Sequence, residues 1–314
     1  MKRLIHLVVL ATLVAGSAFL ANPAGGDNLA AIDPPWPDIA SGPSADPGRN
    51  SGLAWGDFDG DGDDDLYLVK DGPGGPNVLL MNDGSGTFSV CDAPLLADTS
   101  KGLASSWGDF DNDGDLDLFL ANQDGGNRVF RNDGAGGTCW LFSEVISTDL
   151  SLNLESVAAE WVDDDHDGIL DLYISNRDGA NQFLSSDNGF LDQVPGVLSF
   201  PGGSQGVAWC DYDIDMDADL WLVSETDEDF TYTQDNASGF EEQVWTSVIS
   251  GQGCSWGDFD NDGDFDLFVT NWGLNDILWE HLGSGQFQPV ANSGLDLMGC
   301  GPAAAWGDYD NDGV

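Results

Sequence analysis

The strongest constraint on the fold is a short Asp-rich motif that occurs six times at nearly constant spacing. Each copy begins with Trp, as in WGDFDNDGDLDLFLA from Trp107, and the steps from one Trp to the next are 52, 54, 48, 47 and 50 residues. The copies begin at Trp55, Trp107, Trp161, Trp209, Trp256 and Trp306. A period near fifty residues indicates supersecondary units that stack side by side, because one such unit cannot bury its hydrophobic face alone.

Each unit is predicted to contain four short strands. In the first unit the small residues of 52–58 predict one strand, and the apolar run DLYLVK at 65–70 predicts a second, buried on both faces. Residues 77–82 and 87–90 predict two more strands, joined by a DGSG turn at 83–86. Four strands per fifty residues are typical of one blade of a β-propeller. We therefore predict an all-β fold, a β-propeller of four-stranded blades. A β-sandwich with accidental internal similarity would not explain the period.

The Asp residues fall in the loop between the first two predicted strands of each unit. Counted from the first Asp after Trp, carboxylates occupy positions 1, 3, 5 and 9, and Gly usually occupies position 6. Alternate residues of a tight loop can point their oxygens inward, and calcium takes six to eight oxygen ligands. Position 7 is expected to contribute its backbone carbonyl, because the third copy has Ile169 there and a ligating side chain would not tolerate Ile.

The predicted calcium ligands occupy positions 1, 3, 5, 7 and 9 of each loop. In the five complete loops they are Asp57, Asp59, Asp61, Asp63 and Asp65; Asp109, Asp111, Asp113, Asp115 and Asp117; Asp163, Asp165, Asp167, Ile169 and Asp171; Asp211, Asp213, Asp215, Asp217 and Asp219; and Asp258, Asp260, Asp262, Asp264 and Asp266. The sixth loop contributes Asp308, Asp310 and Asp312 before the sequence ends.

Three known types of cation-binding loop fit the motif less well. An EF-hand needs Glu at position 12 and flanking helices, whereas position 12 here is always an aliphatic residue within a predicted strand. A calcium β-roll needs a nine-residue period, and magnesium prefers fewer protein ligands. One Asp-rich turn could be a solvated surface turn, but five complete copies with identical spacing indicate a shared ligand.

The first 24 residues resemble a secretory signal peptide. They contain no acid, Lys2 and Arg3 precede an apolar run at 4–20, and small residues follow. An uncleaved membrane anchor is the alternative, although the apolar run is short for a membrane span. We expect the mature protein to be secreted, periplasmic or associated with the cell surface, without a segment inserted in the membrane.

Charge and cysteine content narrow the possible partners and covalent links. The chain has 56 acidic and 8 basic side chains, for a net charge of −48. Such a chain repels nucleic acid, so no nucleic-acid partner is expected. Five cysteines in an exported chain allow at most two disulfides, in fifteen possible arrangements among which the sequence does not choose.

These motifs resemble the FG-GAP/VCBS repeats of integrin-α-like propellers. The stretch WGDFDNDGDLDLF, followed by NRVFRNDGAG, is most similar to bacterial VCBS-repeat proteins akin to cartilage acidic protein. The resemblance covers about residues 36–314. It implies a calcium-binding propeller, commonly seven-bladed, with calcium in the loop between the first two strands of each blade. Two departures weaken it locally: Met216 replaces the loop Gly of the fourth copy, and residues 229–240 lack the usual third-strand pattern, so an irregular blade is expected there.

The domain organisation follows from the repeats. We predict a signal peptide at 1–24, an N-terminal segment at 25–51, and propeller repeats at 52–314 that comprise five complete units and a truncated sixth. The sequence WPDI at 36–39 matches the outer strand that precedes each new Trp motif, so we expect it to complete a last blade. Because the chain stops inside the sixth loop, we expect the sequence to be a fragment; an open half-ring would expose unpaired strand edges.

The leading functional hypothesis is an adhesion or binding module for an extracellular protein or glycan ligand. The alternative is the propeller domain of a polysaccharide-active hydrolase or lyase. No catalytic constellation is visible: His166 falls within an Asp loop, His281 falls in a turn region, and the GxSxG match around Ser204 precedes a strand without the expected helix. The motif Trp residues are interpreted as a packing layer, because one occurs per unit at the same position.

Overall fold

The computed structural model describes residues 50–300, apart from 73–74, 86, 137–138, 193–197, 226–227, 236–238, 292, 294 and 296–297, together with Ala304 and Trp306. The predicted signal peptide, the predicted strand at 36–39 and the sixth Asp loop lie outside these residues. The chain divides into two compact units. We call Trp36–Gly202 the N-terminal unit and Gly203–Val314, which groups with Met1–Pro35, the C-terminal unit, and describe each by itself.

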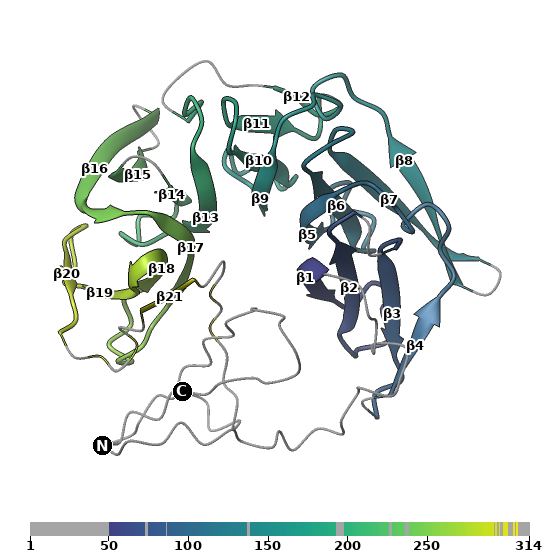
Figure 1. Ribbon diagram of the computed structural model, residues 1–314, viewed down its shortest axis with the longest axis horizontal. Coiled ribbons are helices and arrows are strands. Elements are labelled where there is room, and N and C mark those ends of the chain that lie inside the picture. The colour runs from purple at the N-terminus through teal and green to yellow at the C-terminus, as the bar shows by residue number, and fades with distance from the viewer. Residues whose placement is uncertain are drawn as a thin grey trace. The chain divides into compact units, whose positions relative to one another are not determined.

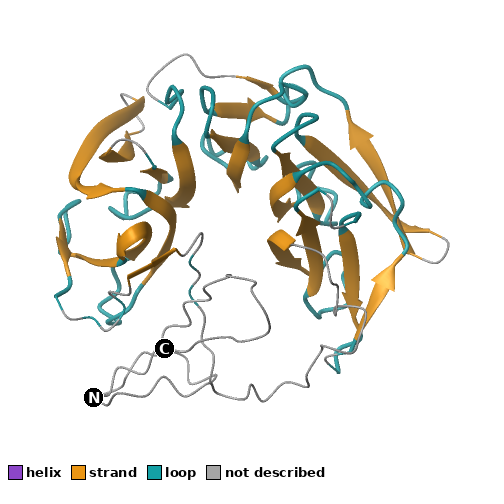
Figure 2. Cartoon of the chain, in the orientation of Figure 1, coloured by secondary structure: helices purple, strands orange, loops and turns teal. Residues whose placement is uncertain are grey.

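The N-terminal unit contains three four-stranded antiparallel sheets, here called blades 1 to 3 (Figures 1 and 2). Blade 1 comprises β1 (Asn50–Gly56), β2 (Asp65–Lys70), β3 (Val78–Asn82) and β4 (Phe88–Cys91). Blade 2 comprises β5 (Gly102–Gly108), β6 (Asp117–Asn122), β7 (Arg128–Gly136) and β8 (Cys139–Val145). Blade 3 comprises β9 (Ser156–Val162), β10 (Asp171–Asn176), β11 (Gln182–Ser185) and β12 (Leu191–Asp192). In each blade the strands pair in chain order, so each blade is a simple meander.

The C-terminal unit contains two further sheets of the same kind, blades 4 and 5. Blade 4 comprises β13 (Ser204–Cys210), β14 (Asp219–Ser224), β15 (Glu228–Asp235) and β16 (Gly239–Ile249). Blade 5 comprises β17 (Gly251–Gly257), β18 (Asp266–Asn275), β19 (Ile277–His281) and β20 (Phe287–Pro289), and β21 (Met298–Cys300) pairs with the end of β18. In the part of the chain that the structure describes there is no helix, and therefore none that could span a membrane.

The fourth blade keeps all four strands, and the expected irregularity is a break in register at the start of β15, where Glu228 lies opposite Ile249 and Asp229 lies opposite Trp245. β15 pairs with β14 and along its whole length with β16, and Leu220 lies opposite Tyr232 as Leu118 lies opposite Phe130 in blade 2. The stretch departs from the sequence pattern of the other third strands. Aromatic and β-branched residues still favour an extended backbone, and Phe230 to Thr233 supply four of them in a row.

The hydrophobic core lies between successive blades. One cluster joins Tyr67 and Val69 of blade 1 to Leu118 and Phe130 of blade 2. A second cluster joins blades 2 and 3, and a third joins blades 4 and 5. Every residue of β2 is buried, including its first residue, Asp65. The second strands are therefore covered on both faces, which accounts for their continuous apolar pattern.

The motif Trp residues lie at the blade junctions. The indole N–H of Trp107 donates to Ala54 O of blade 1 (3.4 Å), and Trp161 and Trp256 donate in the same way to Ser106 O (3.4 Å) and Ala208 O (3.2 Å). All three rings pack against the hydrophobic clusters, as expected for a packing layer. Trp55 differs because no described blade precedes it, and it is 53% exposed.

A disulfide between Cys91 and Cys139 joins the outer part of blade 1 to that of blade 2. Cys91 ends β4 and Cys139 begins β8, and both are buried. This pair is one that the sequence left open among fifteen arrangements.

Candidate metal-binding loops

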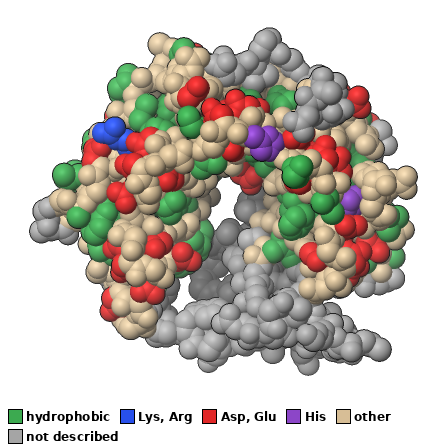
Figure 3. Space-filling model, turned by 180° about the vertical axis from the view of Figure 1, so that it is seen from behind, with side chains coloured by type: hydrophobic (Ala, Val, Ile, Leu, Met, Phe, Trp, Pro, Cys, Tyr) green, Lys and Arg blue, Asp and Glu red, His purple; other side chains and the backbone are tan. Residues whose placement is uncertain are grey.

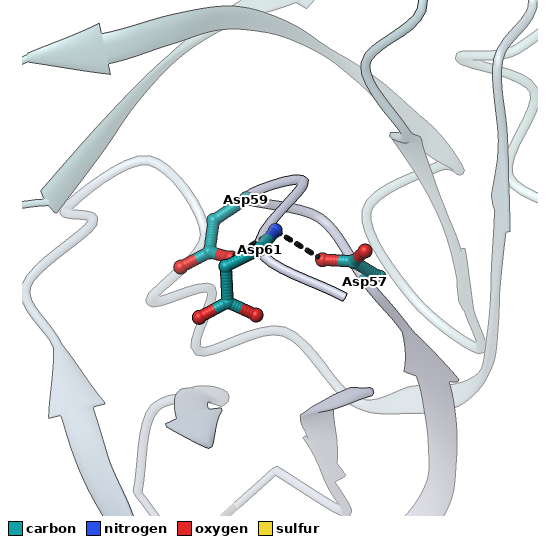
Figure 4. A group of neighbouring side chains, drawn as sticks. All are labelled: Asp57, Asp59 and Asp61. Carbon is teal, nitrogen blue, oxygen red and sulfur yellow. Dashed lines mark hydrogen bonds between the residues drawn. The ribbon is translucent and has the colours of Figure 1, made fainter. Parts of the chain in front are cut away.

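Five Asp loops connect the first and second strands of the five blades. We call residues 57–65, 109–117, 163–171, 211–219 and 258–266 loops 1 to 5. In loop 1 the Asp57 carboxylate closes the turn, because its Oδ1 accepts the backbone N–H of Asp61 (3.0 Å; Figure 4). Its Oδ2 accepts the backbone N–H of Gly62 (3.0 Å). Asp109, Asp211 and Asp258 accept the equivalent pair of bonds, and Asp163 accepts the N–H of Gly168 (3.1 Å). The position 1 carboxylate thus shapes every described loop.

Each loop brings three carboxylates together. One oxygen from each member of a set lies within 4.8 Å of the other two. Three sets come from positions 1, 3 and 5, and two come from positions 1, 3 and 9: Asp57, Asp59 and Asp61; Asp109, Asp111 and Asp117; Asp163, Asp165 and Asp167; Asp211, Asp213 and Asp219; and Asp258, Asp260 and Asp262. The structure therefore places predicted ligands from all five complete loops in groups that one cation could contact.

Burial and mutual repulsion disfavour the ionised form of the position 3 carboxylates. Partial burial, followed by repulsion from the position 5 carboxylate, raises the pKa of Asp59, Asp111, Asp213 and Asp260. Like charges held this close oppose ionisation unless a cation offsets them. The loops therefore hold more negative charge than their own surroundings stabilise.

The position 9 carboxylates lie deepest. Asp117 is fully buried; its Oδ1 accepts the N–H of Asn132 (2.8 Å), and its Oδ2 accepts the N–H of Phe110 (3.1 Å). Asp219 and Asp266 accept equivalent bonds from their own third strands and loops. Burial raises the pKa of Asp65 to about 6 and that of Asp117, Asp219 and Asp266 to about 7. Position 9 anchors the loop to the third strand as well as offering an oxygen.

Loop 3 differs at position 2, where Asp164 replaces the aromatic residue of the other described loops. Burial, followed by repulsion from Asp171, raises the pKa of Asp164 to about 7, and the two side chains share a hydrogen bond. Burial also raises the pKa of Asp171. This acid pair was not predicted, since it joins a ligand position to a position outside the ligand pattern.

Position 7 turns its side chain away from the carboxylate groups in three loops. The side chains of Asp63, Asp115 and Asp264 lie beside Gly84, Gly134 and Gly283, of which Gly134 lies within β7 and the other two follow the third strand of their blade. In loop 3 the residue at position 7 is Ile169. These orientations are those expected if position 7 offers its backbone carbonyl.

Two loop positions require a left-handed backbone. Position 6 has φ of 84° to 97° at its four glycines and 78° at Met216. Position 4 also has positive φ in every described loop: Gly60 (70°), Asn112 (58°), His166 (59°), Ile214 (64°) and Asn261 (61°). The requirement at position 4 was missed in the sequence, although Gly and Asn recur there and tolerate this conformation best. Among the five described loops, only loop 4 has neither Gly nor Asn at position 4 or position 6; it has Ile214 and Met216 there.

The donor set fits a hard divalent cation. The ligand positions offer only oxygen atoms, which calcium prefers. The Oδ1 atoms of Asp163 and Asp213 are buried and accept no hydrogen bond from the described residues. Buried carboxylate oxygens are normally hydrogen-bonded or bound to a cation, so these atoms have the surroundings of metal ligands.

The residues considered for catalysis belong to three different segments of the chain, and each has its own structural surroundings. Ser204 is buried at the start of β13, and a strand follows it. His166 occupies position 4 of loop 3. His281 is buried at the end of β19, where its ring stacks on Phe287 with centroids 4.6 Å apart. Acidic side chains are spread widely over the face shown in Figure 3, where Lys and Arg are few.

Comparison with protein-family models matches an FG-GAP-like repeat to residues 57–120, 109–174 and 258–314. These ranges cover more than half of the chain and include loops 1, 2, 3 and 5. Among solved structures the chain is similar to the crystal structure of Saccharomyces cerevisiae Sqt1, with 12% identity and a TM-score of 0.50. That match covers 71% of this chain and 57% of Sqt1, and at this identity it bears on the fold alone. No curated protein matches the chain. The repeats and the similar structure confirm an all-β fold of the β-propeller type.

Proposed function

Because the chain belongs to the FG-GAP-like repeat family, as its motifs predicted, we propose that loops 1 to 5 bind calcium and that the protein is a calcium-stabilised binding module. The observation that carries the proposal is the grouping of three carboxylates in each described loop, with oxygens within 4.8 Å of one another. The predicted ligands would be Asp at positions 1, 3, 5 and 9 with the backbone carbonyl at position 7. Bound calcium would supply the positive charge that these loops lack.

Calcium would act on the fold through the loop ends. Position 9 is held by the third strand, and position 1 closes the turn after the first strand, so a cation bound to both would connect three strands of a blade. A ligand that binds only the folded state stabilises it by mass action. Extracellular calcium modules typically bind with dissociation constants of about 10⁻⁴–10⁻³ M, which suits a site outside the cell.

We further propose that the protein acts outside the cell and binds a protein or glycan ligand there. The predicted signal peptide at 1–24 supports export, and the Cys91–Cys139 disulfide suits an oxidising compartment. The strongly acidic chain favours cationic partners or partners bridged by calcium over nucleic acid.

Thermal melting with calcium and with a chelator tests the metal proposal. Calcium at millimolar concentration is expected to raise the melting temperature, with magnesium at the same concentration as the control for ionic strength. Native mass spectrometry would count the ions, and Asp59→Asn with Asp61→Asn is expected to remove one. An unchanged melting temperature and no bound ion would refute the proposal.

Binding of the purified protein to arrays of glycans and extracellular-matrix proteins, with and without calcium, tests the partner proposal. Calcium-dependent binding without change to the ligand supports a binding module. Shortening of a bound polysaccharide would refute the module hypothesis and favour the hydrolase or lyase.

A further inference from the structure

Loops 2 and 3 contact each other through one side chain. Asn112, at position 4 of loop 2, donates from Nδ2 to the backbone carbonyl of Gly168, at position 6 of loop 3 (2.5 Å). Asn112 lies between the ligand positions Asp111 and Asp113. Gly168 lies between Asp167 and the position 7 residue, and its own N–H donates to the Asp163 carboxylate (3.1 Å). The bond therefore joins the backbones of two loops next to their predicted ligands.

Loops 1 and 2 are joined by a second asparagine, Asn132, which lies within β7 of blade 2 and pairs with Phe142 of β8. Its Nδ2 donates to the backbone carbonyl of Phe58 (2.9 Å), which lies between Asp57 and Asp59 in loop 1. Its backbone N–H donates to Asp117 Oδ1 (2.8 Å), the position 9 carboxylate of loop 2. Asn132 is fully buried, so both bonds are shielded from water.

These two residues form a continuous polar connection through the N-terminal unit, from loop 1 through loop 2 to loop 3. Each bond fixes backbone atoms that must be placed for a loop to coordinate a cation. Energetic coupling requires such a physical connection and a change that both sites favour. Here the shared change is the ordering of Asp loops that repel themselves when empty.

We propose that Asn112 and Asn132 couple the three loops of the N-terminal unit, so that calcium bound in one loop raises the calcium affinity of its neighbour. The inference rests on the proposed calcium function. Loop 4 has Ile214 at the position of Asn112 and so lacks the amide that would make this bond.

The chain itself supplies matched substitutions for a test. Asn112→Gly removes the amide at φ 58°, and Gly60 already occupies the same position in loop 1. Asn132→Ser copies Ser186 of blade 3, whose N–H donates to Asp171 Oδ1 (2.9 Å) and whose hydroxyl bonds within its own blade. Asn261→Gly is the control, because Asn261 has φ 61° and, among the described residues, donates to no other loop.

Hydrogen exchange of the full chain is followed during calcium titration. It gives, for each loop separately, the calcium concentration at which the loop amides are half protected. Loop 3 is disabled by Asp163→Asn with Asp165→Asn. This change is expected to weaken calcium binding at loop 2 about fivefold when Asn112 is present and to have no effect in the Asn112→Gly background. Asn132→Ser is expected to remove the corresponding dependence of the calcium affinity of loop 1 on calcium binding at loop 2. Asn261→Gly is expected to leave both dependences unchanged.

If disabling loop 3 shifts the calcium midpoint of loop 2 equally with Asn112 and with Gly at position 112, the coupling is overturned while calcium binding stands. The absence of calcium-dependent protection in any loop would overturn the proposed function and this inference together. The melting temperature of each variant in chelator, compared with that of the wild-type chain, shows that loss of coupling is not loss of folding.

Discussion

The indole of Trp107 lies nearly parallel to the ring of Phe58, with centroids 5.8 Å apart and an interplanar angle of 12°. Phe58 occupies position 2 of loop 1, between two predicted ligands, and Trp107 begins the motif of the next blade. Trp161 stacks on Phe110 in the same way (6.0 Å, 10°), and Trp256 stacks on Tyr212 (5.8 Å, 15°). Residues of one loop therefore serve two purposes: positions 1, 3, 5 and 9 offer carboxylates, and the aromatic residue at position 2 supports the next blade.

Gly follows the motif Trp in four of the six copies, and it is expected to be indispensable where a Trp of the next blade covers it. A Cβ on Gly108 would lie 2.6 Å from Trp161 Cδ1, and the stacking on Phe110 limits how far that indole can move. Gly108→Ala is expected to cost about 1–3 kcal/mol of unfolding free energy, measured by urea denaturation. In a Trp161→Leu background the same substitution should cost less. An equal cost in both backgrounds would show that the clash with the indole is not the cause.

Loop 4 is expected to contain the weakest calcium site. Met216 and Ile214 adopt φ of 78° and 64°, and non-Gly residues in this region cost about 1–2 kcal/mol each. Met216→Gly with Ile214→Asn gives loop 4 the residues found in loops 2 and 5. Titration calorimetry should show the weakest class of sites tightening about tenfold, since about 1.4 kcal/mol corresponds to a factor of ten. The reverse change, Gly114→Met at φ 97°, should weaken loop 2; unchanged affinities in both variants would refute the strain argument.

Much of the fold and the main features of the loops could be predicted from the sequence. The predicted strand at 65–70 coincides with β2, because a strand buried on both faces leaves an uninterrupted apolar pattern. The spacing of Asp residues likewise indicated which side chains meet, since residues in one tight loop are close in space wherever the loop lies.

What could not be predicted depends on contacts between distant segments. Asn132 reaches Phe58 across 74 residues, and the Cys91–Cys139 pair is separated by 48. No local pattern identifies such partners, because they become neighbours only when two blades pack. The positive φ at position 4 is different, because the sequence itself indicates it: Gly60, Asn112 and Asn261 are the residue types that tolerate this conformation best.

The disulfide is expected to stabilise the junction of blades 1 and 2. Closing a loop of this length restricts the unfolded chain, and such a bond typically contributes about 2–4 kcal/mol. Reduction should therefore lower the melting temperature of the wild-type chain. In the Cys91→Ser, Cys139→Ser double variant, the reductant should have no further effect on that junction; a wild-type melting temperature that is insensitive to reductant would contradict the prediction.

Calcium is expected to stabilise the protein more at pH 7.5 than at pH 5. Burial raises the pKa of Asp117, Asp219 and Asp266 to about 7 in the folded chain, against about 4 in the unfolded chain. Between these values the folded state binds more protons, so without calcium these groups contribute stability at low pH that is lost as the pH rises through 7. At pH 5 protons compete with calcium, and at pH 7.5 they do not. Melting temperatures in calcium and in chelator at both pH values test this, and a larger calcium effect at pH 5 would contradict it.

A buried carboxylate outside the loops should also limit stability at high pH. Asp276 is buried and accepts the N–H of Asn271 (2.8 Å), as Asn77, Asn127 and Asn181 accept the equivalent N–H in blades 1 to 3. Burial raises the pKa of Asp276 to about 6, so its contribution to stability is present below about pH 4 and is lost as the pH rises through 6.

Asp276→Asn keeps the acceptor and removes the charge. The variant is expected to be about 1–3 kcal/mol more stable than the wild type at pH 8, and of similar stability at pH 4, where the carboxyl is already neutral. Asp229→Asn is the contrasting variant. Burial raises the pKa of Asp229 to about 7, and the Ser224 N–H, which donates to its Oδ1 (3.0 Å), and the nearby Trp221 indole offset part of that shift. An amide at this position would place its NH₂ group near the indole N–H. Urea unfolding at pH 4 and pH 8 measures the free energy of unfolding of both variants. If Asp276→Asn raises it equally at pH 4 and pH 8, the removed charge is not the source of the added stability.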